Sequence, residues 1–191
     1  LDETNPLKIG NKTVMSGTTE FNFVRNCGGI AGYVFSGANI YIKDCVFNGL
    51  EDGSTSFKST SATSCVGGFV GYTVGTNIKI VSSEINYVTI DSMKYNAGGM
   101  IGQCAGTSTF IKGTEEAPVS VTNCNILGVY TGGVIGYTNA STYMEYISCH
   151  GNKIGAVDRT NVAYAGGVIG NISAYYKMSD IECKDLTIYG Y

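Results

Sequence analysis

Five copies of one short glycine motif divide this chain into repeats. Each copy is a pair of glycines, two apolar residues and a further glycine, and the pairs begin at residues 28, 67, 98, 132 and 166, so the spacings are 39, 31, 34 and 34 residues. Repeats of this length are typical of solenoids, in which each unit buries its apolar face only against its neighbours. The motif glycines are Gly28, Gly29, Gly32, Gly67, Gly68, Gly71, Gly98, Gly99, Gly102, Gly132, Gly133, Gly136, Gly166, Gly167 and Gly170.

The composition around these motifs favours strands. The 191 residues include 27 glycines but only 2 prolines, and 43% are hydrophobic while 14% are charged. This balance excludes a disordered glycine-proline tract, and the abundance of Val, Ile, Tyr and Phe suits half-buried sheets. We therefore predict a single all-β domain. It is a β-solenoid of about five repeats of 31–39 residues over 28–191, preceded by an entry segment or partial repeat over 1–27.

A second recurring feature follows each glycine pair. About twelve residues on comes an apolar residue, and five residues later a small one. The pairs are Ile40 and Cys45, Ile78 and Ser83, Val119 and Cys124, Met144 and Cys149, and Met178 and Cys183. This alignment predicts a stacked column formed by Cys45, Cys124, Cys149 and Cys183, and it requires an insertion over 107–117 that bulges out as a loop. A break in alternation between Ile42 and Cys45 predicts a corner there.

The seven cysteines are an odd number, so they cannot all pair within the chain. Buried free thiols are the favoured interpretation of the column, because free cysteine is among the most buried residue types. Cys27 and Cys65, which flank the first two motifs, are the better disulfide candidates. A zinc site is disfavoured because no short-spaced cysteine pairs occur and His150 is the one histidine.

Glycine suits the motif for two reasons: it tolerates positive φ at corners, and it lets stacked backbones approach closely. A nucleotide-binding glycine loop occurs once and precedes a helix. Five copies that precede strand-like sequence exclude that interpretation.

The residue after each motif forms another column: Tyr33, Tyr72, Gln103, Tyr137 and Asn171. Structural stacking of these tyrosines is favoured over a platform for the flat faces of sugars, although both remain open. Triplets of the glycosylation type begin at Asn11, Asn139 and Asn171, and such triplets fit exposed turns of a secreted protein.

The repeated unit, a glycine pair, two apolar residues and a glycine often followed by tyrosine, resembles the GLUG repeat over about 28–191. The resemblance implies a β-solenoid of a bacterial surface or secreted protein, used as a stalk, spacer or adhesive module and without catalytic residues. The chain departs from that family in having Ile, Val, Phe or Met instead of Leu in the motif, and in its cysteines.

Ionisable residues do not converge on a catalytic arrangement in the predicted stack. Asp44 and Glu182 are four coils apart, roughly 19 Å at the strand spacing, whereas paired glycosidase carboxylates lie about 5 to 9.5 Å apart. Glu84 and His150 are two coils apart, and Cys149 and His150 point to opposite faces of one strand. We predict that the protein is not an enzyme and has no cofactor or metal.

We therefore expect a non-catalytic structural or adhesive module located extracellularly or on the cell surface, able to form filaments or surface layers. Its expected partners are itself, end to end, or other surface proteins and glycans. The alternative is a carbohydrate-binding module that uses the tyrosine column, and a polysaccharide-acting β-helix enzyme ranks below both. The net charge of −3 and pI near 5.1 give no basic footprint for nucleic acid, and no apolar run is long enough to enter a membrane.

Overall fold

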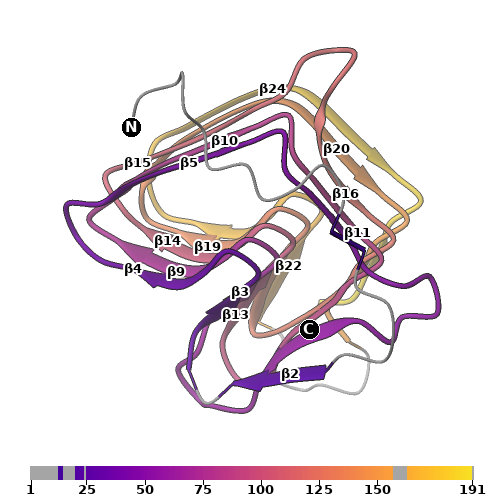
Figure 1. Ribbon diagram of the computed structural model, residues 1–191. Helices are drawn as coiled ribbons and strands as arrows, with labels where there is room; N and C mark the ends of the chain where they lie inside the picture. The colour runs from indigo at the N-terminus through magenta and orange to yellow at the C-terminus, as the bar shows by residue number, and fades with distance from the viewer. Residues whose placement is uncertain (1–12, 15–19, 24, 157–162, 191) are drawn as a thin grey trace.

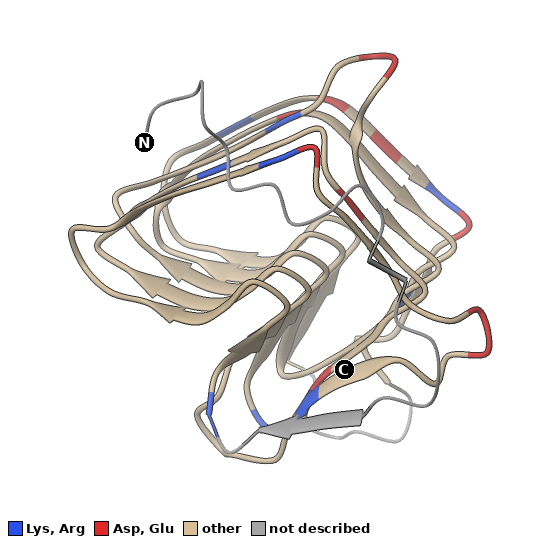
Figure 2. Ribbon diagram, in the orientation of Figure 1, with Lys and Arg blue, Asp and Glu red and all other residues tan. Residues whose placement is uncertain are grey.

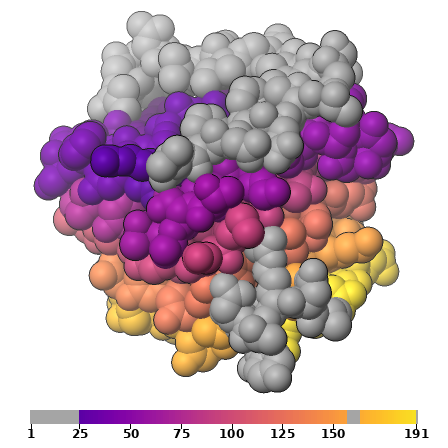
Figure 3. Space-filling model, turned by 90° about the horizontal axis from the view of Figure 1, so that it is seen from below, coloured from indigo at the N-terminus to yellow at the C-terminus, as the bar shows by residue number. Residues whose placement is uncertain are grey.

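The chain winds into a β-solenoid of parallel strands, as predicted (Figure 1). The computed structural model describes residues 13–14, 20–23, 25–156 and 163–190, and every regular element in these ranges is a β-strand. Each strand pairs in parallel with the equivalent strand of the next coil. The coils lie on one another as successive layers from the N-terminal to the C-terminal end (Figure 3).

Four sheets run along the stack, and each coil contributes strands to all of them. Sheet 1 contains β1 (Thr13–Val14), β5 (Asn39–Lys43), β6 (Val46–Asn48), β10 (Asn77–Val81), β11 (Glu84–Asn86), β15 (Ser108–Lys112), β16 (Val119–Thr122), β20 (Ser141–His150) and β24 (Tyr176–Lys184). Sheet 2 contains β2 (Glu20–Phe23), β7 (Ser56–Ser59), β12 (Thr89–Ser92), β17 (Asn125–Leu127), β21 (Lys153–Ile154) and β25 (Thr187–Ile188).

Sheets 3 and 4 flank the glycine motifs. Sheet 3 contains β3 (Cys27–Gly28), β8 (Val66–Gly67), β13 (Asn96–Gly98), β18 (Tyr130–Gly132) and β22 (Tyr164–Gly166). Sheet 4 contains β4 (Ala31–Val34), β9 (Val70–Val74), β14 (Ile101–Ala105), β19 (Ile135–Thr138) and β23 (Ile169–Ile172). The first glycine of each pair ends a strand of sheet 3, and the second lies at the corner that leads into sheet 4.

The core consists of ladders of apolar side chains in register from coil to coil. One ladder is formed by Ile42, Ile80, Ile111, Met144 and Met178. A second is formed by Phe57, Ile90, Ile126, Ile154 and Ile188. Each residue of a ladder is buried by the equivalent residue of the next coil. The coils therefore stabilise one another, as the repeat length predicts.

Sheet 1 turns through corners made by residues in the left-handed conformation. The predicted corner between Ile42 and Cys45 is present, with Asp44 at φ 50°. Equivalent corner residues of later coils are Ser82 (φ 42°), Tyr146 (φ 52°) and Asp180 (φ 54°). The corner into sheet 2 uses Tyr87, Asn123, Gly151 and Asp185, all with positive φ.

The motif glycines are required by close approach of backbones, and not by their own dihedral angles. The described glycines with positive φ are Gly37, Gly53, Gly75, Gly151 and Gly155, and none of them belongs to a motif. A methyl group on Gly99 would overlap the carbonyl oxygen of Gly133 in the next coil. Of the two expected reasons for glycine, close approach is therefore correct, and positive φ is wrong for the motifs.

The third repeat differs from the alignment expected from the sequence. Residues 108–112 do not bulge out but form β15, in which Ile111 pairs with Ile80 and Met144. The excursion is shorter than 107–117 and runs from Gly113 to Pro118, closed by a bond from the Thr114 amide to the Ala117 carbonyl.

The observed register places the four cysteines of the predicted column in three different ladders. Cys45 lies against Ser83 and Cys124 against Asn152, and only Cys149 and Cys183 are in register with each other. The expected column of four cysteines is therefore wrong. Met144 is in register with Ile42, Ile80 and Ile111, and not with Ile40 and Ile78 as the spacing suggested. Cys45 and Cys124 directly follow two different corners, at Asp44 and Asn123.

The expected disulfide is also wrong. Cys27 pairs with Val66 and packs in the core, whereas the Cys65 thiol lies on the other face of sheet 3 and contacts Gln103. Side chains on opposite faces of a sheet cannot join.

The cross-section of the stack is an angle, not a closed oval. Sheets 3 and 4 form two arms that meet at the glycine corners, and the faces of both arms turn toward each other on the outside of the core (Figure 1). The corner apex carries Phe69, Met100 and Val134, which are buried in the core. The glycines thus create a re-entrant groove that runs along the stack.

Replacing an apex glycine tests this account. We expect Gly99→Ala to lower the free energy of unfolding by about 3 kcal/mol, because its methyl group overlaps the Gly133 carbonyl and lies 2.7 Å from Val121 Cγ1. A methyl group on Gly37 would have no atom within 4 Å, but this residue has φ +85°. Gly37→Ala should therefore lower the free energy of unfolding by about 1 kcal/mol. Urea unfolding measures both, and equal losses would contradict close packing as the role of the motif.

Candidate binding groove

The re-entrant groove is lined by two facing columns of side chains, one from each arm. On sheet 4 lie Tyr33, Tyr72, Gln103, Tyr137 and Asn171, in register as predicted. On sheet 3 the residues two positions before each glycine pair lie opposite: Asn26, Cys65, Asn96, Tyr130 and Tyr164. In every repeat the two residues are seven apart in sequence, so one coil supplies one facing pair. We call this surface the tyrosine groove.

Facing residues contact each other across the apex in the later coils. Asn96 Nδ2 donates to Gln103 Oε1 at 2.7 Å. In the next coil the Tyr130 and Tyr137 rings lie 5.8 Å apart, and Tyr130 also lies 5.4 Å from Tyr164. These contacts rigidify the groove floor and leave its open part at the first coils.

The first coils enclose two hollows. The inner hollow, of about 260 Å³, is lined by Tyr33, Cys65, Tyr72, Tyr95 and Gln103 among others. The outer hollow, of about 710 Å³, adjoins it. Asn26, Tyr33 and Thr63 line both, so the two form one continuous depression in the size range of small-ligand sites.

The described strands that form the groove walls carry no charged residues. The strands of sheets 3 and 4 contain no Asp, Glu, Lys or Arg within their described bounds, and charged residues lie on the other faces and turns (Figure 2). Burial raises the pKa of Tyr72 and of Tyr95, with smaller contributions from neighbouring phenols and thiols. Their hydroxyls therefore stay protonated and can donate hydrogen bonds at neutral pH.

Another aromatic ladder, on the outer face of sheet 1, is a contrasting case. Phe110 and Tyr143 stack at 4.9 Å with planes 5° apart, and Lys79 lies over Tyr41 and Phe110. These rings already have intramolecular partners on their faces. The Tyr33 ring also has neighbours, Phe35 at 4.6 Å and Tyr72 at 5.0 Å, but it is tilted by 48° and 57° to them and not stacked on either. Tyr33 is 40% exposed, so part of its ring surface remains free in the groove.

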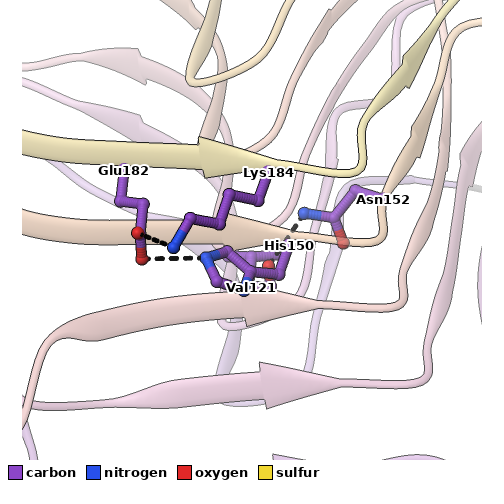
Figure 4. Close-up of polar contacts among 5 residues, drawn as sticks. All are labelled: Val121, His150, Asn152, Glu182 and Lys184. Carbon is purple, nitrogen blue, oxygen red and sulfur yellow. Dashed lines mark hydrogen bonds and ion pairs between the residues drawn. The ribbon is translucent and has the colours of Figure 1, made fainter.

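The ionisable residues near the C-terminal coils make a surface ion-pair network, away from the groove strands. His150 Nε2 lies 3.0 Å from Glu182 Oε2, and Lys184 pairs with the other oxygen of that carboxylate (Figure 4). Hydrogen bonds with Lys184 and His150 lower the pKa of Glu182. Asn152 lies further inside and donates to the Val121 carbonyl at 2.8 Å.

The other predicted acidic and nucleophilic candidates do not meet. Cys149 is buried in the core while the His150 ring lies on the outer face of β20, so the two do not act on each other as nucleophile and base. Glu84 pairs in register with Ser120, and Glu182 with Ser148, so two coils separate these carboxylates.

The thiols fall into two environments. Burial raises the pKa of Cys27, Cys65 and Cys124 to about 12 in each case. Cys183 is exposed, and a hydrogen bond from the Cys149 thiol, assisted by His150, lowers its pKa to about 7.

The glycosylation-type triplets lie in different settings. Asn139 is exposed in the turn between β19 and β20, where its backbone N–H donates to the Cys104 carbonyl. Asn171 is half-buried in β23 at the end of the tyrosine column. Asn11 lies outside the described residues.

Sequence reasoning found only one wall of the groove. The sheet 3 column was missed because its members, two amides, a thiol and two tyrosines, share no chemistry. The constant spacing of seven residues between the two columns was the available signal, and its meaning depends on the angle at the glycine corner.

Thiol labelling tests the contrast between the two environments. At pH 7.5 we expect iodoacetamide to modify Cys183 in the native protein while Cys27, Cys65 and Cys124 stay unmodified, because only a thiolate reacts. Cys149→Ala removes the hydrogen bond that stabilises the Cys183 thiolate, so the rate should fall about fivefold. Mass spectrometry over a pH series measures both, and an unchanged rate would refute the coupling between these thiols.

Two further observations bear on the site. Among the described residues there is no group of three or more His, Cys, Asp or Glu side chains arranged to hold a metal, and no helix that could cross a membrane. Comparison with known family models, curated proteins and solved structures found no match. The function is therefore argued from the geometry of the groove.

Proposed function

We propose that this protein is a non-catalytic adhesive and structural module that acts outside the cell and binds carbohydrate along the tyrosine groove. The observation that carries the proposal is the pair of facing columns, which places aromatic and amide side chains on both walls of one continuous depression. An adhesive module needs such a surface on a rigid support, and the parallel stack supplies it.

The chemistry of the groove suits a sugar polymer. Exposed faces of Tyr33 and Tyr72 offer flat apolar surface to pyranose rings, while amide and phenol groups offer hydrogen bonds to hydroxyls. The groove follows the stack axis, so an extended chain can lie across several coils. Carbohydrate is favoured over nucleic acid because Arg25 is the one positive side chain among the described residues that line the hollows, whereas a row of phosphates requires several.

The proposed location and non-catalytic role rest on further features. The glycine repeat resembles GLUG repeats, which implies a secreted or surface protein, and Asn139 presents an exposed glycosylation-type triplet. Neither hollow is lined by a described carboxylate, and glycoside cleavage by the common mechanism uses two of them.

Removing the tyrosine rings tests the groove. We expect Tyr72→Ala and Tyr137→Ala each to weaken binding to immobilised polysaccharides by about tenfold, because each loses a stacking surface. Tyr175→Ala is the matched control, since this ring is 74% exposed on a turn outside the groove. Affinity electrophoresis on a panel of neutral and acidic polysaccharides measures the loss. If the wild type bound none of them, the proposal would be wrong.

A second candidate function is end-to-end association, as expected for a filament or surface layer. Among the described strands, β24 in the last coil pairs with β20 alone, and the core-ladder residues Met178 and Ile181 are half-buried. Ile188 is 45% exposed, although its ladder partner Ile154 is fully buried. A further β-coil from a second copy could cover this open edge, because unpaired parallel strands are a template for pairing.

Light scattering over a concentration series tests this association. We expect the mean mass to rise with concentration, and Ile188→Lys to abolish the rise by placing a charge on the open edge. Met93→Lys, on an exposed turn of a middle coil, should leave the rise unchanged. A constant monomer mass would exclude self-assembly under these conditions and leave carbohydrate binding unaffected.

A further inference from the structure

The inner hollow presents hydrogen-bond donors. The side-chain oxygen of Asn26 already accepts a bond from the Cys65 amide at 2.8 Å. The side-chain oxygen of Gln103 accepts bonds from Asn96 Nδ2 at 2.7 Å and from the Cys65 thiol at 3.2 Å. Both lone pairs of the Gln103 oxygen are therefore used, so Gln103 offers a ligand its NH2, which can only donate. Asn26 keeps its NH2 as a donor beside an oxygen that already accepts one bond.

The tyrosines add further donors. The raised pKa values of Tyr72 and Tyr95, caused by burial, keep both hydroxyls protonated. A hollow lined by amide NH2 groups and phenols favours a ligand rich in acceptors. Sugar hydroxyls accept, and a carboxylate accepts more strongly because it carries charge.

The charge of the lining residues also favours a ligand with a carboxylate. Arg25 lines the outer hollow, beside Asn26, which lines both hollows. Among the described residues that line either hollow, Arg25 is the one charged side chain. A guanidinium forms paired hydrogen bonds with a carboxylate and stays charged at any working pH.

We propose that the two hollows bind an acidic sugar residue, a pyranose that carries a carboxylate. The ring lies against Tyr33 and Tyr72, its hydroxyls accept from Gln103, and its carboxylate accepts from Arg25 and the Asn26 amide. This inference rests on carbohydrate binding in the groove and specifies its ligand class. An acidic peptide fits less well, because the free ring surface of the tyrosines is matched by a flat pyranose.

Two ligand pairs isolate the carboxylate. The probes are an oligogalacturonate with its fully methyl-esterified form, and sialyllactose with lactose, so uronic and sialic acids are tested separately. Isothermal titration at low salt should show that the acid of at least one pair binds about tenfold more tightly than its neutral partner. Added salt should reduce this difference, because screening weakens an ion pair at an open site.

Three variants locate the contacts. Arg25→Gln should remove the preference for the acid while neutral binding stays, and Tyr72→Ala should weaken acid and neutral alike. Gln103→Glu keeps an acceptor for Asn96 but puts a negative charge in the hollow, so it should abolish acid binding. Lys153→Gln is the matched control, because this exposed lysine lies on β21 outside the groove. Circular dichroism and thermal melting confirm that each variant is folded.

The outcomes separate the two proposals. Equal, Tyr72-dependent binding of acid and neutral sugars would overturn the acidic-sugar inference and leave carbohydrate binding in place. Acid binding that survives Arg25→Gln would also overturn it. Binding of poly-glutamate but of no sugar would overturn both and reassign the groove to acidic peptides, and no binding of any probe by the folded wild type would overturn both.

Discussion

Close contact between backbones at the glycine corner is the constraint on which the rest of this structure depends. Four apex glycines, Gly29, Gly68, Gly99 and Gly133, each face the carbonyl oxygen of the equivalent glycine in the next coil at a separation that leaves no room for a methyl group. Because the chain can fold inward there, sheets 3 and 4 become two arms with an outer surface between them. A side chain at that point would overlap the backbone of the next coil.

The same constraint connects stability with function. The corner buries Phe69, Met100 and Val134 on its inner side, and it brings Asn96 against Gln103 and Tyr130 against Tyr137 on its outer side. Packing of the core therefore fixes the geometry of the groove, without help from loops. A binding surface built on strands of a parallel stack loses little entropy when a ligand arrives, because its side chains are already held in place.

Sequence reasoning reached the fold because its main signal was periodic. The five motifs set the number of coils, and the break in alternation after Ile42 located a corner that Asp44 makes in the left-handed conformation. The alignment of the repeats was wrong where the period was interrupted. The third repeat was aligned through Val119 instead of Ile111, since the chain returns to the stack only after the Gly113–Pro118 excursion. The cysteine column followed from that misalignment and from a second one, of two residues, that matched Met144 with Ile40 and Ile78 instead of Ile42 and Ile80.

The sequence by itself determined the repeat, the strand content, and the tyrosine column in register, because all three depend on spacing along the chain. Only the tertiary structure decided what faces that column. The residues of the facing column, two amides, a thiol and two tyrosines, do not share one chemistry. The place of Asn96 opposite Gln103 depends on the angle between two sheets. The glycine motif predicted that the backbones of neighbouring coils approach closely, but spacing along the chain does not encode how the two sheets are inclined to each other at that contact.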